Sequence, residues 1–260
     1  MKQTILSAKQ SELLESLIVT YGHIVALDQI YDKARLQWEE TQIKNVVTKL
    51  TSDGWLIRLK RGLYAISDLS NRGFLSLSPY IVANLLVKDS YVSFESALSY
   101  RGLFDQLTNK VISVSKSRYK AIPINAIEYD FVKIQEKWFF GWEDVVVENQ
   151  KVRIATAEKA LVDTIQFHKS KYSVDLVIEK LHSNLGSLDI GRLHEYLSKM
   201  STTTVKVFGF IFDLLGMDSS HIYSLLKNKR STDWMFADDK KFNAKWRLYY
   251  DEYFDKYQKN

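Results

Sequence analysis

Residues that could contact a nucleic acid gather on one predicted helix, from about Glu39 to Ser52. Ile43, Val47 and Leu50 recur there at the spacing of one buried helix face. The rest of its surface carries amides and hydroxyls, which could bond to base edges, and lysines, which could pair with phosphates. The predicted DNA-contacting residues of this helix are Thr41, Gln42, Lys44, Asn45, Thr48 and Lys49.

A second group of candidate contacts lies on a predicted β-hairpin. Residues 55–66 alternate apolar and polar side chains, turn at Arg61-Gly62 and return as a second strand. The hairpin carries Arg58, Lys60 and Arg61, with no acidic residue among positions 55–64. Such a basic tip could lie against the sugar–phosphate backbone or enter the minor groove.

Both features also fit an ordinary protein surface. Any amphipathic surface helix has a polar outer face, and any hairpin can carry basic residues. Glu39 and Glu40 would repel phosphates, although acidic residues also favour a helix N-terminus. DNA binding is favoured because three predicted helices followed by a basic hairpin follow the order of a winged helix-turn-helix domain. Winged helices also bind proteins, so a protein-interaction module is the alternative.

A further basic stretch has no acidic residue between positions 108 and 125. It could form a secondary surface for nucleic acid or for another partner. Lysines that protect the edge of a sheet explain the same pattern equally well. The cationic residues of this stretch are Lys110, Lys116, Arg118 and Lys120.

The sequence contains no recognisable catalytic motif. There is no nucleophile elbow, phosphate-binding loop or dinucleotide-binding glycine pattern, and the five histidines lack metal-ligand spacing. Residues 148–151 and 238–241 combine acids with lysine, as Mg²⁺-dependent nucleases do. The first group has the wrong spacing, and the second is predicted to lie in a loop. We therefore expect no catalytic residue, no metal site, no cofactor and no enzymatic activity, with a nuclease as a minor alternative.

Length and composition fit a globular protein of one or two domains. The chain has 260 residues, 46% of them hydrophobic, with a formal net charge of +5 and no cysteine. Residues 68–73 have the composition of a linker. We predict an α+β fold, with a winged helix-turn-helix domain at residues 1–72 and a larger domain at residues 73–260. The larger domain is expected to mix strands and helices to about residue 155 and to be mainly helical after it.

Several local signals predict how particular segments begin, turn or dock. Ser7 and Gln10 have the spacing of a capping box. Ser93 is expected to cap the helix that follows it, and Asn149-Gln150 to form the turn of a hairpin. Trp246 is expected to hold the C-terminal segment against the rest of the protein.

No segment has the length and apolarity of a membrane span. The most apolar stretch, residues 205–217, contains Lys206 and Asp213 and falls short of the ~20 residues that a span requires. No apolar run of signal-peptide length follows the N-terminus. The sequence therefore predicts a cytoplasmic protein without membrane association.

Three segments together resemble one protein family, the AbiEi-type antitoxins of the AbiE type IV toxin–antitoxin and phage abortive-infection systems. Residues 60–66 resemble the family's basic-Gly-aliphatic-Tyr wing, residues 91–103 its Tyr-Ile-Ser…Ala-Leu…Gly-Leu segment, and residues 154–163 its Glu-Lys-Ala-Leu-x-Asp helix start. Their order and spacing match over about residues 10–170. Arg101 stands where relatives often carry a histidine.

The resemblance implies a winged-helix domain that binds inverted repeats in double-stranded DNA upstream of its own operon and represses transcription. It also implies a larger domain that counters a nucleotidyltransferase toxin, without a stable complex between the two proteins. If the chain belongs to this family but has no toxin partner, the alternative is a solitary transcriptional regulator.

Overall fold

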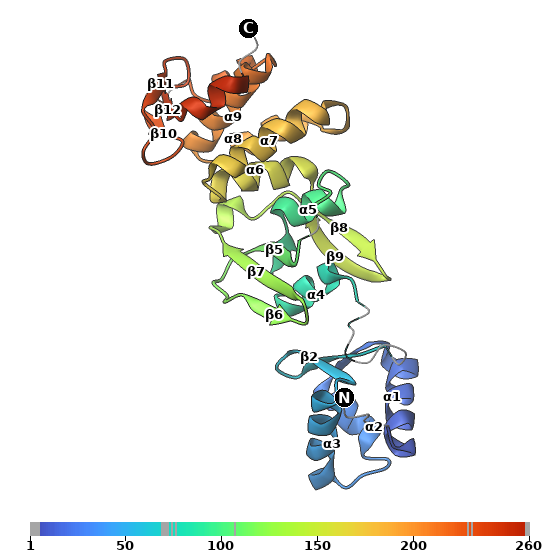
Figure 1. The fold of residues 1–260 in the computed structure, drawn as a ribbon. Coiled ribbons are helices and arrows are strands. Elements are labelled where there is room, and N and C mark those ends of the chain that lie inside the picture. Colours follow the sequence, from blue (N-terminus) through green and yellow to red (C-terminus); the bar gives the residue numbers. More distant parts are fainter. Residues whose placement is uncertain are drawn as a thin grey trace. The chain divides into compact units, whose positions relative to one another are not determined.

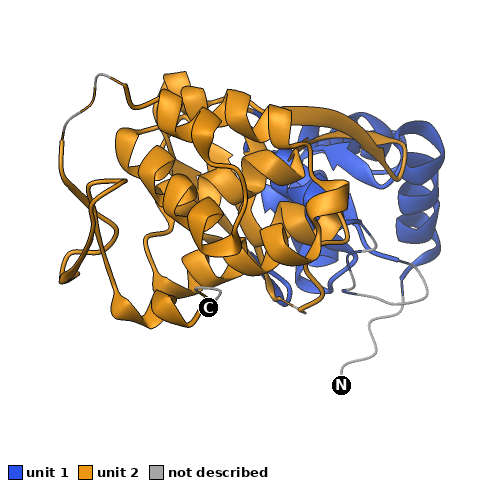
Figure 2. Ribbon diagram, turned by 90° about the horizontal axis from the view of Figure 1, so that it is seen from above, with its two compact units in different colours: residues 1–88, 123–127 blue, residues 89–122, 128–260 orange. Residues whose placement is uncertain are grey.

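The computed structural model describes residues 6–68, 73, 75, 77–106, 108–227, 229 and 231–257. The chain is of mixed α and β structure and divides into two compact units (Figure 2). The first unit comprises residues 1–88 and 123–127, and the second comprises residues 89–122 and 128–260. Residues 69–72, in the predicted linker, lie outside the described residues, so the boundary after residue 72 stays a prediction.

In the first unit, the three helices α1 to α3 accompany a small antiparallel sheet, and a fourth helix, α4, follows the sheet in the chain (Figure 1). The predicted helices and hairpin form, and strand β1, which was not predicted, joins the hairpin in the order β1-β3-β2. The apolar stripes of the three helices meet in one core with the inner residues of the sheet. In chain order, the elements of this unit are α1 (Ala8–Tyr21), β1 (Ile24–Ala26), α2 (Leu27–Ala34), α3 (Glu40–Ser52), β2 (Leu56–Lys60), β3 (Leu63–Ile66) and α4 (Pro79–Leu86).

Local interactions explain where α1 starts and where the hairpin turns. The predicted capping box is confirmed, because Gln10 N donates to Ser7 Oγ at 3.3 Å and Ser7 N donates to Gln10 Oε1 at 3.0 Å. Gly62 adopts a φ of +75° in the turn between β2 and β3, a conformation that favours glycine. Its carbonyl accepts a hydrogen bond from Leu27 N at 2.9 Å, so the turn is bonded to the start of α2.

The strands β4 to β9 form a mixed sheet with the order β6-β7-β5-β4-β9-β8, most of which belongs to the second unit. β5 and β7 run parallel, as do β4 and β9, while β8 and β9 form an antiparallel hairpin. Helix α5 (Phe94–Tyr100) lies between β4 and β5 in the chain. The strands are β4 (Ser90–Val92), β5 (Lys110–Ser115), β6 (Ile122–Ile124), β7 (Ile127–Lys133), β8 (Trp142–Val147) and β9 (Gln150–Ala155).

Two local predictions in this sheet need correction. The β8–β9 turn consists of Glu148 and Asn149, one residue earlier than predicted, because both adopt a positive φ, of 47° and 63°, and Gln150 already pairs with Val147. Ser93 occupies the position before α5 but makes no side-chain cap. Its hydroxyl donates instead to the buried carboxylate of Asp163, at 2.8 Å.

Helices dominate the chain after β9, and a short sheet follows them. Short 3₁₀ helices span Leu185–Ser187 and Glu252–Tyr257 in this part of the chain, and another spans Glu136–Trp138 between β7 and β8. The predicted mainly helical region contains the helices α6 (Ala157–Phe167), α7 (Lys171–Ser183), α8 (Ile190–Ser198), α9 (Thr202–Leu215) and α10 (Ser220–Ser224). The strands β10 (Asp233–Trp234), β11 (Lys241–Asn243) and β12 (Leu248–Tyr250) were not predicted, since two or three residues are too few to show an alternation.

The predicted docking of Trp246 is confirmed. Its side chain is 1% exposed, and its indole Nε1 donates to Asp213 Oδ2 of α9 at 2.6 Å. The ring lies over Gly209, where an added Cβ would come within 2.2 Å of it. Among the described residues, no helix is long and apolar enough to cross a membrane.

Candidate nucleic-acid interface

Helix α3 presents one buried face and one polar face. Ile43, Val47 and Leu50 are buried in the core of the first unit. The predicted contacts Thr41, Gln42, Lys44, Asn45, Thr48 and Lys49 are all exposed. This follows from the helical period of the sequence, because apolar residues three and four positions apart turn the remaining side chains toward solvent.

Among the described residues, two of these polar side chains have partners within the protein. Thr48 Oγ1 donates to the carbonyl of Lys44 at 2.8 Å, and Lys49 Nζ lies 3.4 Å from Asp53 Oδ2. Near the helix start, Glu40 pairs with Arg35 at 3.3 Å, which reduces the repulsion that this acid would exert on a phosphate. Because Lys49 is exposed, solvent reaches its pair with the half-buried Asp53, and the ammonium can exchange this partner for a phosphate.

The three basic residues of the hairpin differ in their surroundings. Arg58 and Arg61 are exposed, and no described carboxylate lies within ion-pair distance of either. Lys60 Nζ instead donates to the carbonyls of Leu85 at 2.5 Å and Leu86 at 3.5 Å, at the C-terminal end of α4. A cation is favourable there because the last carbonyls of a helix lack partners within it. The hairpin therefore offers two unpaired cations.

The predicted secondary basic surface is partly neutralised. Lys110 Nζ lies 3.1 Å from Glu128 and 3.0 Å from Asp130, and hydrogen bonding to Asp130 raises the pKa of Lys110. Lys116 pairs with Glu136 at 2.5 Å. Arg118 and Lys120 are exposed, and no ion pair to either occurs in the described part of the chain. The four residues therefore do not act as one cluster of free positive charge.

The two acidic groups weighed as a nuclease site lie apart in the fold of the second unit. Glu148 belongs to the β8–β9 turn, whereas Asp239 lies before β11 of the small sheet. Asp238 and Asp239 line a hollow of about 240 Å³, and Asp239 Oδ2 accepts the backbone N–H of Phe236 at 2.7 Å. In the described parts of the chain, no three residues with carboxylate or imidazole side chains are grouped to hold a metal ion.

Sequence reasoning missed a buried polar cluster in the second unit. Lys159 and Asp163, one turn apart on α6, form a fully buried ion pair. Tyr91 and Ser93 donate to the other carboxylate oxygen of Asp163, at 3.0 and 2.8 Å. Burial lowers the pKa of Lys159 and raises the pKa of Asp163, while their mutual attraction opposes both shifts. The side chains of Lys159 and Asp163 are fully buried, so the cluster connects β4 and the residue after it to α6 inside the unit.

The spacing of Lys159 and Asp163 gave the only sequence signal for this cluster, since residues four apart share a helix face. Gly141 makes room for it: at a φ of +81°, an added Cβ would stand 2.8 Å from Lys159 Cγ. No pattern within the sequence places Tyr91 and Ser93 beside α6.

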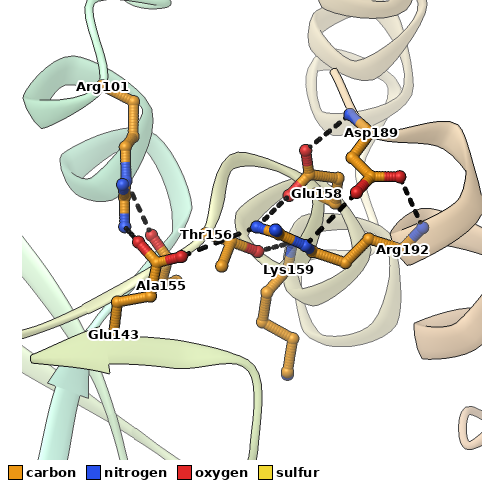
Figure 3. Close-up of polar contacts among 8 residues, drawn as sticks. All are labelled: Arg101, Glu143, Ala155, Thr156, Glu158, Lys159, Asp189 and Arg192. Atoms are coloured by element: carbon orange, nitrogen blue, oxygen red, sulfur yellow. Dashed lines mark hydrogen bonds and ion pairs between the residues drawn. The ribbon is translucent and has the colours of Figure 1, made fainter. Parts of the chain in front are cut away.

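Two arginines join the surrounding elements at the edge of this cluster (Figure 3). Arg101 donates to the carbonyl of Ala155 at 3.2 Å and to Glu143 at 2.8 Å. Arg192 of α8 lies 3.6 Å from the other oxygen of Glu143 and 3.9 Å from the buried Glu158. These contacts link α5, β8, β9, α6 and α8, so the arginines have partners inside the unit.

Comparison with known proteins provides a fold but no function. No protein-family model and no curated protein sequence matches the chain. Among solved structures, the chain is similar to the RV2827C protein from Mycobacterium tuberculosis, with a TM-score of 0.67 and 13% sequence identity. The similarity covers 95% of this chain and 92% of that chain. At this identity, the likeness shows a shared mixed α and β fold and nothing about binding.

Proposed function

We propose that the first unit is a winged helix-turn-helix module that binds double-stranded DNA. In this proposal, α3 lies in the major groove and the β2–β3 hairpin is the wing. The supporting observation is that α3 has two different faces: its apolar stripe is buried, and its amides, hydroxyls and lysines are exposed. Beside it in the chain, the hairpin adds Arg58 and Arg61, for which no partner carboxylate is described.

We further propose that the protein is a transcriptional repressor of its own operon and an antitoxin against a nucleotidyltransferase. This part rests on the resemblance of residues 60–66, 91–103 and 154–163 to AbiEi-type antitoxins. The partners proposed are inverted repeats upstream of the operon and a toxin that is antagonised without a stable complex.

The wing is tested by removing its two unpaired cations. Arg58→Ala with Arg61→Ala should weaken binding to all duplex sequences, because phosphate contacts carry no sequence information. The slope of log K against log salt should fall by about 2, close to one unit per lost phosphate contact. Gel-shift titrations at several salt concentrations on upstream DNA measure both.

Lys9→Ala with Lys33→Ala is the matched control, since it removes the same charge from α1 and α2. Equal losses in the two double variants would mean that net charge, and not the wing, governs binding. Absence of any shift by the wild-type protein, together with co-purification of the neighbouring gene product, would favour a protein-interaction module. Growth rescue of cells that express a neighbouring nucleotidyltransferase tests the antitoxin part.

A further inference from the structure

Three aromatic side chains form a row across the small sheet of the second unit. Trp234 of β10 and Phe242 of β11 both stand opposite Tyr249 of β12 in the strand register. Each of the two ring centroids lies 5.0 Å from that of Tyr249, and the planes of Trp234 and Tyr249 are inclined by only 11°. These three residues are termed the aromatic row.

The aromatic row lies on the solvent face of its sheet. The neighbours of Tyr249 in β12, Leu248 and Tyr250, are buried, and the ring of Tyr250 packs at 4.5 Å from that of Phe210 in α9. Because side chains alternate between the faces of a strand, Tyr249 points away from α9. Trp234 is 49% exposed and Phe242 46% exposed, so both rings present free surface.

The charges around the small sheet leave one arginine without an acidic partner. Asp233 pairs with the buried Lys206 at 2.5 Å, Asp251 with Lys171 and Asp255 with Lys241. Arg247 is exposed, and its guanidinium lies 3.5 Å from the hydroxyl of Thr232, two residues before Trp234. As far as the structure describes the chain, no carboxylate forms an ion pair with Arg247. Arg247 precedes Tyr249 by two residues and contacts Thr232, which precedes Trp234 by two residues, so a cation without a described carboxylate partner stands next to two members of the aromatic row in the chain.

We propose that the aromatic row binds single-stranded nucleic acid, with bases stacked on Trp234 and Phe242 and a phosphate held by Arg247. Sequence-tolerant single-strand binding combines these two elements, aromatic faces for bases and cations for the backbone. A neutral sugar could stack on the same rings but would leave Arg247 without a role. The site lies wholly in the second unit and does not depend on the proposed function of the first.

The test uses the full chain with Arg58→Ala and Arg61→Ala, so that the proposed wing contributes little. Fluorescence anisotropy measures its binding to labelled oligouridylate and oligothymidylate of about ten nucleotides, a length within the range of single-strand sites. Trp234→Ala with Phe242→Ala should weaken binding about tenfold or more, as expected for loss of base stacking. Tyr172→Ala, which removes an equally exposed aromatic side chain from α7, should leave affinity unchanged.

Arg247→Gln leaves the aromatic row in place, so it tests the site even if the variant that lacks the aromatic side chains does not fold. It should reduce the salt slope by about 0.7, the value for one phosphate contact with a single strand. Tighter binding of the uridylate would indicate recognition of the 2′-hydroxyl, and equal binding would indicate stacking indifferent to the sugar; both support the proposal. Binding of neither oligonucleotide, or affinity and salt slope unchanged in both variants, would overturn it, whatever the first unit does with duplex DNA.

Discussion

Buried charged side chains occur in the second unit and not among the described residues of the first. In the first unit, α3 and the hairpin direct amides, lysines and arginines to solvent, and few of these groups meet a strong partner. In the second unit, Lys159 and Lys206 are buried and paired with Asp163 and Asp233. Outward charges are available to a ligand, whereas buried pairs fix the packing of the elements that carry them. Substitutions of the exposed charges should therefore change nucleic-acid binding, whereas substitutions of the buried pairs should change the stability of the fold.

Asp163→Ala should give the largest effect, on folding. It leaves the Lys159 ammonium buried without its carboxylate, and breaking a buried pair in this way costs about 3–5 kcal/mol. Urea denaturation of the full chain measures the loss. The double variant Lys159→Met with Asp163→Leu should recover most of it, because no uncompensated charge is left. A single variant as stable as the wild type would contradict the structural role of the pair.

Gly209→Ala should destabilise the second unit by about 1–3 kcal/mol, the usual range for overpacking. The new methyl group would overlap the ring of Trp246, which lies on the Gly209 backbone. Thermal unfolding measures the effect, and Gly186→Ala is the control, since a Cβ at Gly186 meets no atom within 4 Å. The affinity of Gly209→Ala for duplex DNA should not change. Equal melting temperatures for both variants would mean that Trp246 is displaced at little cost.

Unlike the two substitutions in the second unit, Asn45→Ala should change the sequence preference of DNA binding and leave the stability of the fold nearly unchanged. If its amide pairs with a base edge, discrimination against other operator sequences falls by about 1–3 kcal/mol. Competition gel shifts with upstream and scrambled duplexes separate this loss from a uniform weakening. Ser52→Ala, on the last turn of the same helix, serves as the control for a change of side chain alone. If the sequence preference of Asn45→Ala equals that of the wild type, the proposed base recognition by α3 is contradicted.

Lys60→Ala should have the smallest effect. Lys60 is intermediate between the exposed cations of the first unit and the charged side chains that are bound within the protein. Its ammonium is exposed, yet it binds carbonyls at the end of α4. We expect a loss of stability below about 1 kcal/mol, typical of a cation at a helix C-terminus, and a smaller change in salt slope than for Arg61→Ala. Paired measurements of melting temperature and salt slope decide this. A salt slope that falls as far as in Arg61→Ala would make Lys60 a phosphate contact.

The sequence predicts most elements of the first unit because its signals are local. The Ser7 capping box, the α3 stripe and the Arg61-Gly62 turn each depend on residues within a few positions of one another. β1 escapes prediction because three residues carry no detectable period. The exposure of the α3 contacts follows from the same helical period, but the binding of Lys60 to α4 does not, since 25 positions separate Lys60 from Leu85.

The features of the second unit that sequence reasoning missed depend on distant segments. Tyr91 reaches Asp163 across 72 positions, and Ser93 reaches it across 70, so its hydroxyl was assigned to a cap it does not form. The aromatic row likewise becomes visible only when Trp234 and Phe242 are placed beside Tyr249 by strand pairing. A single sequence shows the residues of such a site without their arrangement.

The hydrogen bond from Leu27 N to Gly62 O has a consequence for affinity. A wing that hangs free must lose conformational entropy when a ligand holds it, and each immobilised arginine adds to that loss. Here the turn is already bonded to the start of α2, and Ile66 N donates to His23 O at 2.8 Å at the other end of β3. The backbone that carries Arg58 and Arg61 is thus ordered before any phosphate arrives. Only the two side chains have conformational freedom left to lose, so the hairpin proposed as a wing is preorganised for contact with phosphates.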